Sequence, residues 1–141
     1  MSTILTNTIT GTTSAGSIVV TGEGGSTTTN LQQGLLKTWM SMNGSSTIAL
    51  FDSLNTASIT DNGSGDYTQT YTNAMSNNDY STVVTVRAQG TGYLNGGMIG
   101  EDNSYAMVTG NVRVTTNFAG ASSSAREDRG IVNTQIAGDL A

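Results

Sequence analysis

The stretch from Leu36 to Ala88 constrains the fold most, because short apolar runs alternate there with clusters of turn residues. At its centre, the runs Ser53–Thr60 and Tyr67–Thr72 flank the sequence Asp61-Asn62-Gly63-Ser64-Gly65-Asp66. Two alternating runs around a loop rich in Gly, Asn and Asp are the usual signal of a β-hairpin, since these residues tolerate the positive φ of the turn. The stretch therefore predicts a series of short strands with a hairpin in their middle.

Further strands are predicted along the rest of the chain. They cover Ser17–Thr21, Leu36–Met42, Thr47–Phe51, Tyr80–Ala88, Tyr105–Phe118 and Gly130–Ala137. The segments Gly22–Thr29, Gln89–Ser104 and Ala119–Arg129 are predicted as a linker and two surface loops. Tyr80–Ala88 is apolar on both faces, which predicts a central strand. Eight or nine strands without a long helix predict an all-β fold: an antiparallel, jelly-roll-like β-sandwich with an extended N-terminal arm.

The composition favours a protein that borrows part of its core from identical neighbours. Only 35% of the 141 residues are apolar, whereas 24 are Thr, 18 are Gly and 16 are Ser. A small chain must bury enough apolar area to offset the entropy lost on ordering, and this inventory is thin for a monomer. Because Thr suits half-buried pleated surfaces, we expect a β protein that assembles with identical copies of itself.

Several functional classes do not fit the sequence. A net charge of −5 with five Lys and Arg residues argues against direct nucleic-acid binding, which needs clustered cations. The sequence has no Cys and no His, which removes disulfides, thiolate metal sites and the usual catalytic triads. No apolar run is long enough for membrane insertion, and the N-terminus lacks the basic region of a signal peptide. We expect no enzyme activity, no cofactor and no bound metal.

The N-terminal residues differ from the rest of the chain because they contain few large apolar side chains. We expect residues 1–33 to form a β arm or linker, and residues 34–141 to form the β-sandwich knob. The arm is either flexible, or it forms a docking strand or a thin intertwined stalk that joins copies, since exposed strand edges seek partners. In the second case its large apolar side chains would contact an acceptor surface or neighbouring copies: Ile4, Leu5, Ile9, Ile18, Val19 and Val20.

Trp39 has two interpretations. In the alternating run Leu36–Met42 it points away from the face of Met40 and Met42. Either a neighbouring subunit covers this second face, or Trp39 belongs to a satellite cluster inside the knob.

Acidic residues form the remaining candidate sites. Asp61–Asp66 is similar to a calcium loop but lacks the terminal bidentate Glu, so the pattern favours a hairpin turn. The pairs Glu101–Asp102 and Glu127–Asp128 could serve a glycosidase, but adjacent carboxylates without surrounding aromatic residues favour a solvated surface. Arg126 and Arg129 flank the second pair, which indicates either a self-neutralising loop or an intersubunit salt-bridge cluster.

Five segments carry a resemblance to known proteins: Ser2–Ile9, Gly34–Gly44, Ser58–Thr68, Ala74–Tyr80 and Ile136–Ala141. They resemble a family of bacteriophage virion proteins, labelled tail-fibre-like or head-decoration β-knob proteins, from phages of cyanobacteria and other marine bacteria. The chain departs from the family at Ser76, where Pro is usual, and near Ala137, where a larger apolar residue is usual. The resemblance implies a homotrimeric β-sandwich knob displayed on a phage particle, and it carries no active-site residues.

Three functions compete on these grounds. The first is a capsid decoration or cement protein on the outside of the head, made in the host cytoplasm and bound to the major capsid protein or other virion proteins. The second is a receptor-binding tail-fibre tip that binds host surface glycans, for which the long loops offer Tyr93 and Tyr105. The third is a polysaccharide-degrading enzyme. With only about 35 residues before the knob, the chain has room for a stalk of about 110 Å at full extension, so we expect decoration rather than a complete fibre.

Overall fold

The computed structural model describes residues 3–12, 18–22, 25, 28–87, 95–99, 107–119 and 124–141. For residues 95–99, 118, 119 and 124 it describes the backbone alone. The chain divides into two compact units, residues 1–35 and residues 36–141.

The first unit contains a short antiparallel pair. Strand β1 (Val19–Thr21) pairs with β2 (Thr28–Asn30), so the prediction of a linker is wrong for its last residues. A turn follows in which the backbone N–H of Gln33 donates to Oδ1 of Asn30 (3.0 Å), and that of Gly34 donates to the Asn30 carbonyl (3.0 Å). The side chain of Asn30 therefore caps this turn.

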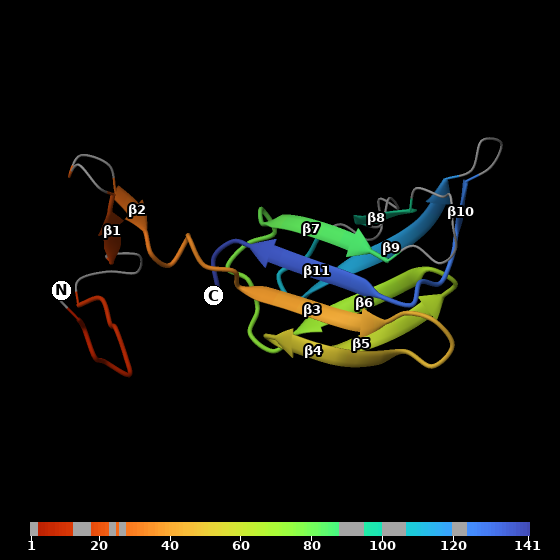
Figure 1. Ribbon diagram of the computed structural model, residues 1–141, viewed down its shortest axis with the longest axis horizontal. Coiled ribbons are helices and arrows are strands. Elements are labelled where there is room, and N and C mark those ends of the chain that lie inside the picture. Colours follow the sequence, from red (N-terminus) through yellow and green to blue (C-terminus); the bar gives the residue numbers. More distant parts are fainter. Residues whose placement is uncertain are drawn as a thin grey trace. The chain divides into compact units, whose positions relative to one another are not determined.

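The second unit consists of two antiparallel sheets, shown in Figure 1. The four-stranded sheet has the order β4 (Ala49–Leu54), β3 (Thr38–Asn43), β11 (Val132–Ala137), β7 (Ser81–Val86). The five-stranded sheet has the order β10 (Ser124–Arg126), β9 (Asn111–Ala119), β6 (Asp66–Tyr71), β5 (Thr56–Gly63), and β8 (Asn95–Ile99) also pairs with β9.

The all-β prediction is confirmed, since the described residues form strands and no helix. The two sheets are consistent with a β-sandwich. The eleven strands in the described residues exceed the predicted eight or nine, and the jelly-roll-like topology is not confirmed.

One predicted strand contains the corner between the two sheets. The run Ser53–Thr60 was expected to be continuous, but β4 ends at Leu54 and β5 begins at Thr56 in the other sheet. Asn55 makes this corner with φ of 56°, a conformation that Asn tolerates better than most residues. Its Oδ1 accepts the backbone N–H of Asn73 (2.7 Å), which holds the corner against the segment after β6.

The predicted central strand lies at an edge. Strand β7 is the last strand of the four-stranded sheet, and Val83 is 54% exposed on it. The prediction of a central position for Tyr80–Ala88 is therefore wrong. Val84 and Val86 face the core, while Val83 pairs with Gln135 on the opposite, outer face.

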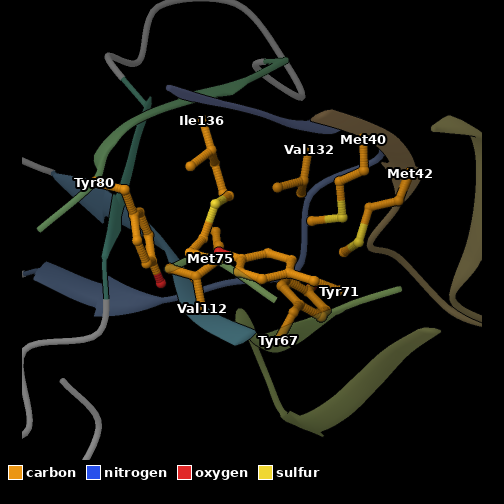
Figure 2. Packing of buried hydrophobic residues seen from close by; sticks show 10 residues of the cluster. Met40, Met42, Tyr67, Tyr71, Met75, Tyr80, Val112, Val132 and Ile136 are labelled. Carbon is orange, nitrogen blue, oxygen red and sulfur yellow. The ribbon is translucent and has the colours of Figure 1, made fainter. Parts of the chain in front are cut away.

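Side chains from both sheets meet in one core, shown in Figure 2. Met40, Met42, Val132 and Ile136 come from the four-stranded sheet. Tyr67, Tyr71, Val112 and Val114 come from the five-stranded sheet, and Met75 and Tyr80 come from the connecting segment. The predicted alternation of Met40 and Met42 against Trp39 on β3 is confirmed, because both methionines are buried and Trp39 is only partly buried.

A hydrogen-bonded polar group lies inside this core. Gln69 is fully buried on β6, and its Nε2 donates to the hydroxyls of Thr38 (3.1 Å) and Thr56 (2.8 Å). Its Oε1 accepts the hydroxyl of Thr134 (2.6 Å). The amide thus joins β6 to strands of the opposite sheet, at a place where an unpaired polar group would destabilise the fold.

We expect Gln69→Leu to lower the free energy of unfolding by about 1–3 kcal/mol, because the buried hydroxyl of Thr134 loses its acceptor. The double variant Gln69→Leu with Thr134→Val should recover most of this loss, since the hydroxyl that lost its acceptor is then removed. The hydroxyls of Thr38 and Thr56 still donate to the carbonyls of Leu54 and Trp39. Urea unfolding followed by circular dichroism measures the difference. Equal stability of the single variant and the native protein would contradict the structural role of this network.

Candidate functional site

The predicted central hairpin is present, and its turn is tighter than the sequence pattern suggested. β5 and β6 run antiparallel and are joined by Ser64 and Gly65. Gly63 and Gly65 have φ of 128° and 61°, which are conformations that side chains rarely adopt. Oδ1 of Asp61 accepts the backbone N–H of Gly63 (2.9 Å), so this carboxylate holds the turn.

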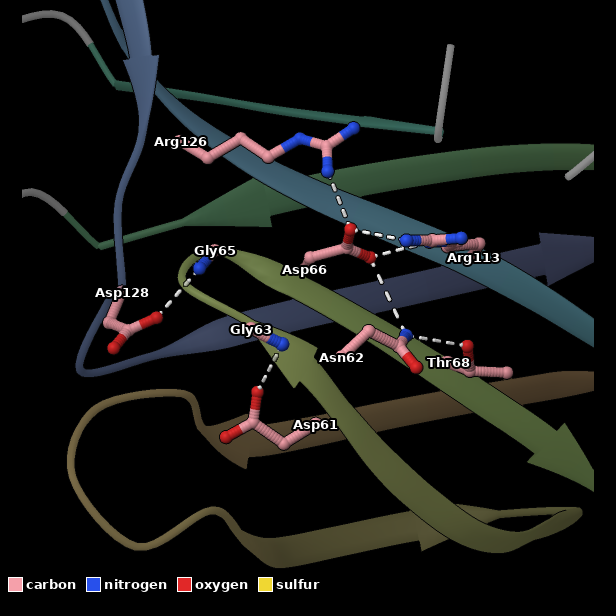
Figure 3. Close-up of polar contacts among 9 residues, drawn as sticks. All are labelled: Asp61, Asn62, Gly63, Gly65, Asp66, Thr68, Arg113, Arg126 and Asp128. Carbon is pink, nitrogen blue, oxygen red and sulfur yellow. Dashed lines mark hydrogen bonds and ion pairs between the residues drawn. The ribbon is translucent and has the colours of Figure 1, made fainter. Parts of the chain in front are cut away.

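Asp66, the first residue after the turn, is a buried carboxylate held by two arginines (Figure 3). Nε and Nη2 of Arg113 contact its two oxygens, each at 2.6 Å, and Nη1 of Arg126 contacts Oδ2 at 2.6 Å. The hydrogen bonds from Arg113, and the charges of both guanidinium groups, hold the pKa of Asp66 below its usual range despite its burial. The carboxylate is therefore ionised at neutral pH.

Residues 126–129 run beside this hairpin and bind two neighbouring turns. The N–H of Glu127 donates to the Thr116 carbonyl (2.9 Å), and Oδ1 of Asp128 accepts the N–H of Gly65 (2.6 Å). The hydroxyl of Tyr67 lies between Oδ1 of Asp128 (3.1 Å) and the Gly44 carbonyl, and it contacts both. The 126–129 segment thus fixes the turn between β5 and β6 to the core.

Two glycines allow residues 126–129 to lie close to the two neighbouring turns. A Cβ atom on Gly65 would lie 2.6 Å from the Glu127 nitrogen and 2.6 Å from the Thr116 oxygen. A Cβ atom on Gly44 would lie 2.9 Å from the Arg129 carbonyl oxygen and 2.9 Å from the Tyr67 hydroxyl. Larger residues at either position would push the 126–129 segment away from the turns.

The arginines of this segment have separate partners. Arg126 pairs with Asp66 rather than with its acidic neighbours, whereas Arg129 is 2% exposed and pairs with Glu127 (2.7 Å). The prediction of a surface loop is wrong for its last residues, because Arg129 is buried. The interpretation as a self-neutralising loop holds for the Arg129–Glu127 pair, and the intersubunit interpretation stays a prediction.

The acidic residues of the hairpin region stabilise the structure through these contacts. Asp61 and Asp128 accept backbone N–H groups, and Asp66 neutralises arginines. Within the described residues, no group of three acidic, Cys or His side chains is arranged to hold a metal ion. The sequence pattern missed the role of Asp66 and Arg113, because only the register of β6 against β9 places Asp66 opposite Thr115 and diagonal to Arg113.

The predicted contact residues of the arm are exposed. Ile4 is 86% exposed and Leu5 is 93% exposed. Ile9, Val19 and Val20 are also more than half exposed, and Ile18 is partly buried. Exposed apolar side chains gathered in one short segment are typical of a binding surface.

Trp39 lies on the outer face of the four-stranded sheet and is partly buried. The strand register places Leu54, Trp39, Gln135 and Val83 in one row across β4, β3, β11 and β7. Leu54 is 47% exposed and Val83 is 54% exposed. We call this surface the outer face; its second row contains Asp52, Ser41, Asn133 and Thr85.

Some predicted positions lie outside the described residues. These are the Glu101–Asp102 pair and the aromatic residues Tyr93 and Tyr105.

Comparisons of the chain with protein-family models, curated proteins and solved structures gave no match. The resemblance to phage virion proteins therefore stays a prediction based on short motifs. In the part of the chain that the structure describes, no helix has the length and apolarity needed to cross a membrane.

Asp66→Asn should destabilise the protein by about 2 kcal/mol at neutral pH, because two buried or half-buried guanidinium groups lose their counter-charge. The lowered pKa of Asp66 means that its contribution is present above the unfolded-state pKa, about 3.9, and is lost as the pH falls through the folded-state pKa. Urea unfolding at several pH values should show the native protein and the variant converging in acid. A difference that stays constant down to about pH 2 would contradict this account.

A chelator should leave the thermal unfolding midpoint unchanged, since the carboxylates of the hairpin region bind backbone N–H groups and arginines. Differential scanning calorimetry with and without the chelator, and again with added Ca²⁺, measures this. A drop of several degrees on chelation would show that Asp61–Asp66 is a metal loop after all.

Proposed function

We propose that the chain is a non-enzymatic structural protein of a phage virion: a homotrimeric decoration protein on the outside of the head. The observation that carries the proposal is the set of exposed apolar side chains in the first unit, led by Ile4 and Leu5. The motif resemblance to virion proteins supports the same function.

The first unit has the properties of an attachment segment. Burying one Ile or Leu side chain contributes about 1.5–3 kcal/mol, so Ile4, Leu5 and Ile9 together could offset the cost of ordering a short strand. An extended segment of this kind binds by adding a strand to an acceptor edge, where main-chain hydrogen bonds give affinity and alternate side chains fill pockets. In this proposal the acceptor is the capsid shell, and the second unit projects outward.

The second unit has the properties of a knob rather than of an enzyme. Asp66 is kept ionised by two arginines, which makes it unsuitable as a general acid at neutral pH. Asp128 holds the backbone of Gly65 in the turn. Asp66 and Asp128 therefore stabilise the hairpin.

Deletion of residues 2–29 tests the proposal. The truncated protein should stay soluble and rich in β-structure by circular dichroism, because the core lies within residues 36–141. It should no longer co-sediment with phage heads that were assembled without this protein. Undiminished occupancy would place attachment in the knob, and failure to fold would show that the arm belongs to the core.

A matched pair of full-length variants tests attachment without the risk that a deletion prevents folding. Ile4→Ser with Leu5→Ser should reduce head occupancy by at least tenfold, since each loses an apolar contact worth about 1 kcal/mol or more. Thr10→Ser, in the same segment, should bind as the native protein does. Binding of labelled protein to host cells instead of heads would favour the tail-fibre alternative.

A further inference from the structure

Two opposite charges lie at opposite edges of the outer face. Asp52 is exposed on β4, one edge of the four-stranded sheet, and pairs with Ser41 in the second row. Arg87 is exposed directly after β7, the other edge, and its N–H donates to the Ile131 carbonyl (2.9 Å), which continues the ladder. Alternation along the strand puts Arg87 on the same face as Val83 and Thr85.

Between these charges the outer face carries exposed apolar side chains. Leu54 lies at the β4 edge and Val83 at the β7 edge, with Trp39 between them. Each edge therefore presents one apolar side chain and one charge, and the two charges have opposite signs. Such a surface is complementary to a second copy of itself when the β4 side of one outer face meets the β7 side of the next outer face.

The β4 edge has further apolar surface available for contact. Phe51 is 61% exposed and Leu50 is 37% exposed, beside the bulge where β4 pairs irregularly with β3. Exposed apolar edge strands are favoured sites for pairing with another chain.

We propose that copies of the chain assemble through the outer face, with Asp52 of one copy paired to Arg87 of the next. The proposal rests on the homotrimer of the proposed function and identifies its contact. A head-to-tail contact of this kind closes into a ring when its rotation is one third of a turn, so each copy contributes one Asp52 and one Arg87. Trp39 then lies within the contact.

Reciprocal charge reversal in the full-length protein tests the proposal. Asp52→Arg and Arg87→Asp each bring like charges together, and each should weaken trimer formation by about tenfold or more. The double variant Asp52→Arg with Arg87→Asp restores the opposite charges in reversed order and should assemble as the native protein does. Asp79→Arg changes the net charge as Asp52→Arg does but lies outside the outer face, so it should assemble normally.

Two measurements give the result. Sedimentation equilibrium gives the oligomeric state of each variant, and circular dichroism confirms that each is folded. Because Trp39 is the single tryptophan, its fluorescence emission should shift to shorter wavelength on assembly in the native protein and the double variant, but not in the single variants.

Two outcomes overturn the proposal, and neither decides the question of head attachment. If both single variants form the trimer as the native protein does, the copies meet through another surface. The homotrimer itself would then not be in question. If the native protein stays monomeric at high concentration, the proposed contact between copies does not form. The head occupancy of the variant Ile4→Ser with Leu5→Ser would still test decoration separately. Recovery in the double variant supports the pairing directly.

Discussion

The contact between Asp66 and its two arginines is the interaction on which the five-stranded sheet depends most. Asp66 begins β6 directly after the central turn, Arg113 lies on β9, and Arg126 ends β10. One buried carboxylate thus joins β6 to two consecutive strands whose arginines lie 47 and 60 residues further along the chain. If it were lost, β10 and the 126–129 segment would lose their charged contact with the hairpin, and the buried guanidinium of Arg113 would lose its counter-charge.

The core shows how a chain poor in aliphatic residues can still fold. Tyr67, Tyr71 and Tyr80 supply much of its volume, and the rings of Tyr71 and Tyr80 pack edge to face with centroids 6.1 Å apart. Methionines fill irregular gaps, which suits a core between unequal sheets. Gln69 also lies in the interior, where its hydrogen bonds to the hydroxyls of Thr38 and Thr134 satisfy their polar groups. Threonines can therefore occupy buried positions in this fold.

The local pattern of the sequence predicted where turns and strands lie better than it predicted which strands are neighbours in a sheet. The hairpin turn at Ser64–Gly65 and the inward residues of β11 follow from turn chemistry and alternation, which are local properties. The edge position of β7 was not predictable, because a run with Val83, Val84 and Val86 looks the same in a central strand as in an edge strand with one exposed valine. The corner at Asn55 and the Asp66 cluster depend on register between distant strands, which no short segment encodes.

Imaging of labelled particles tests the proposal that this β knob decorates a phage head in groups of three. A gold-labelled tag would be placed after Ala141, which is exposed, and the virions would be imaged by electron cryomicroscopy. The account predicts label over the head surface in clusters of three. Label confined to the tail, or single isolated labels on the head, would contradict it.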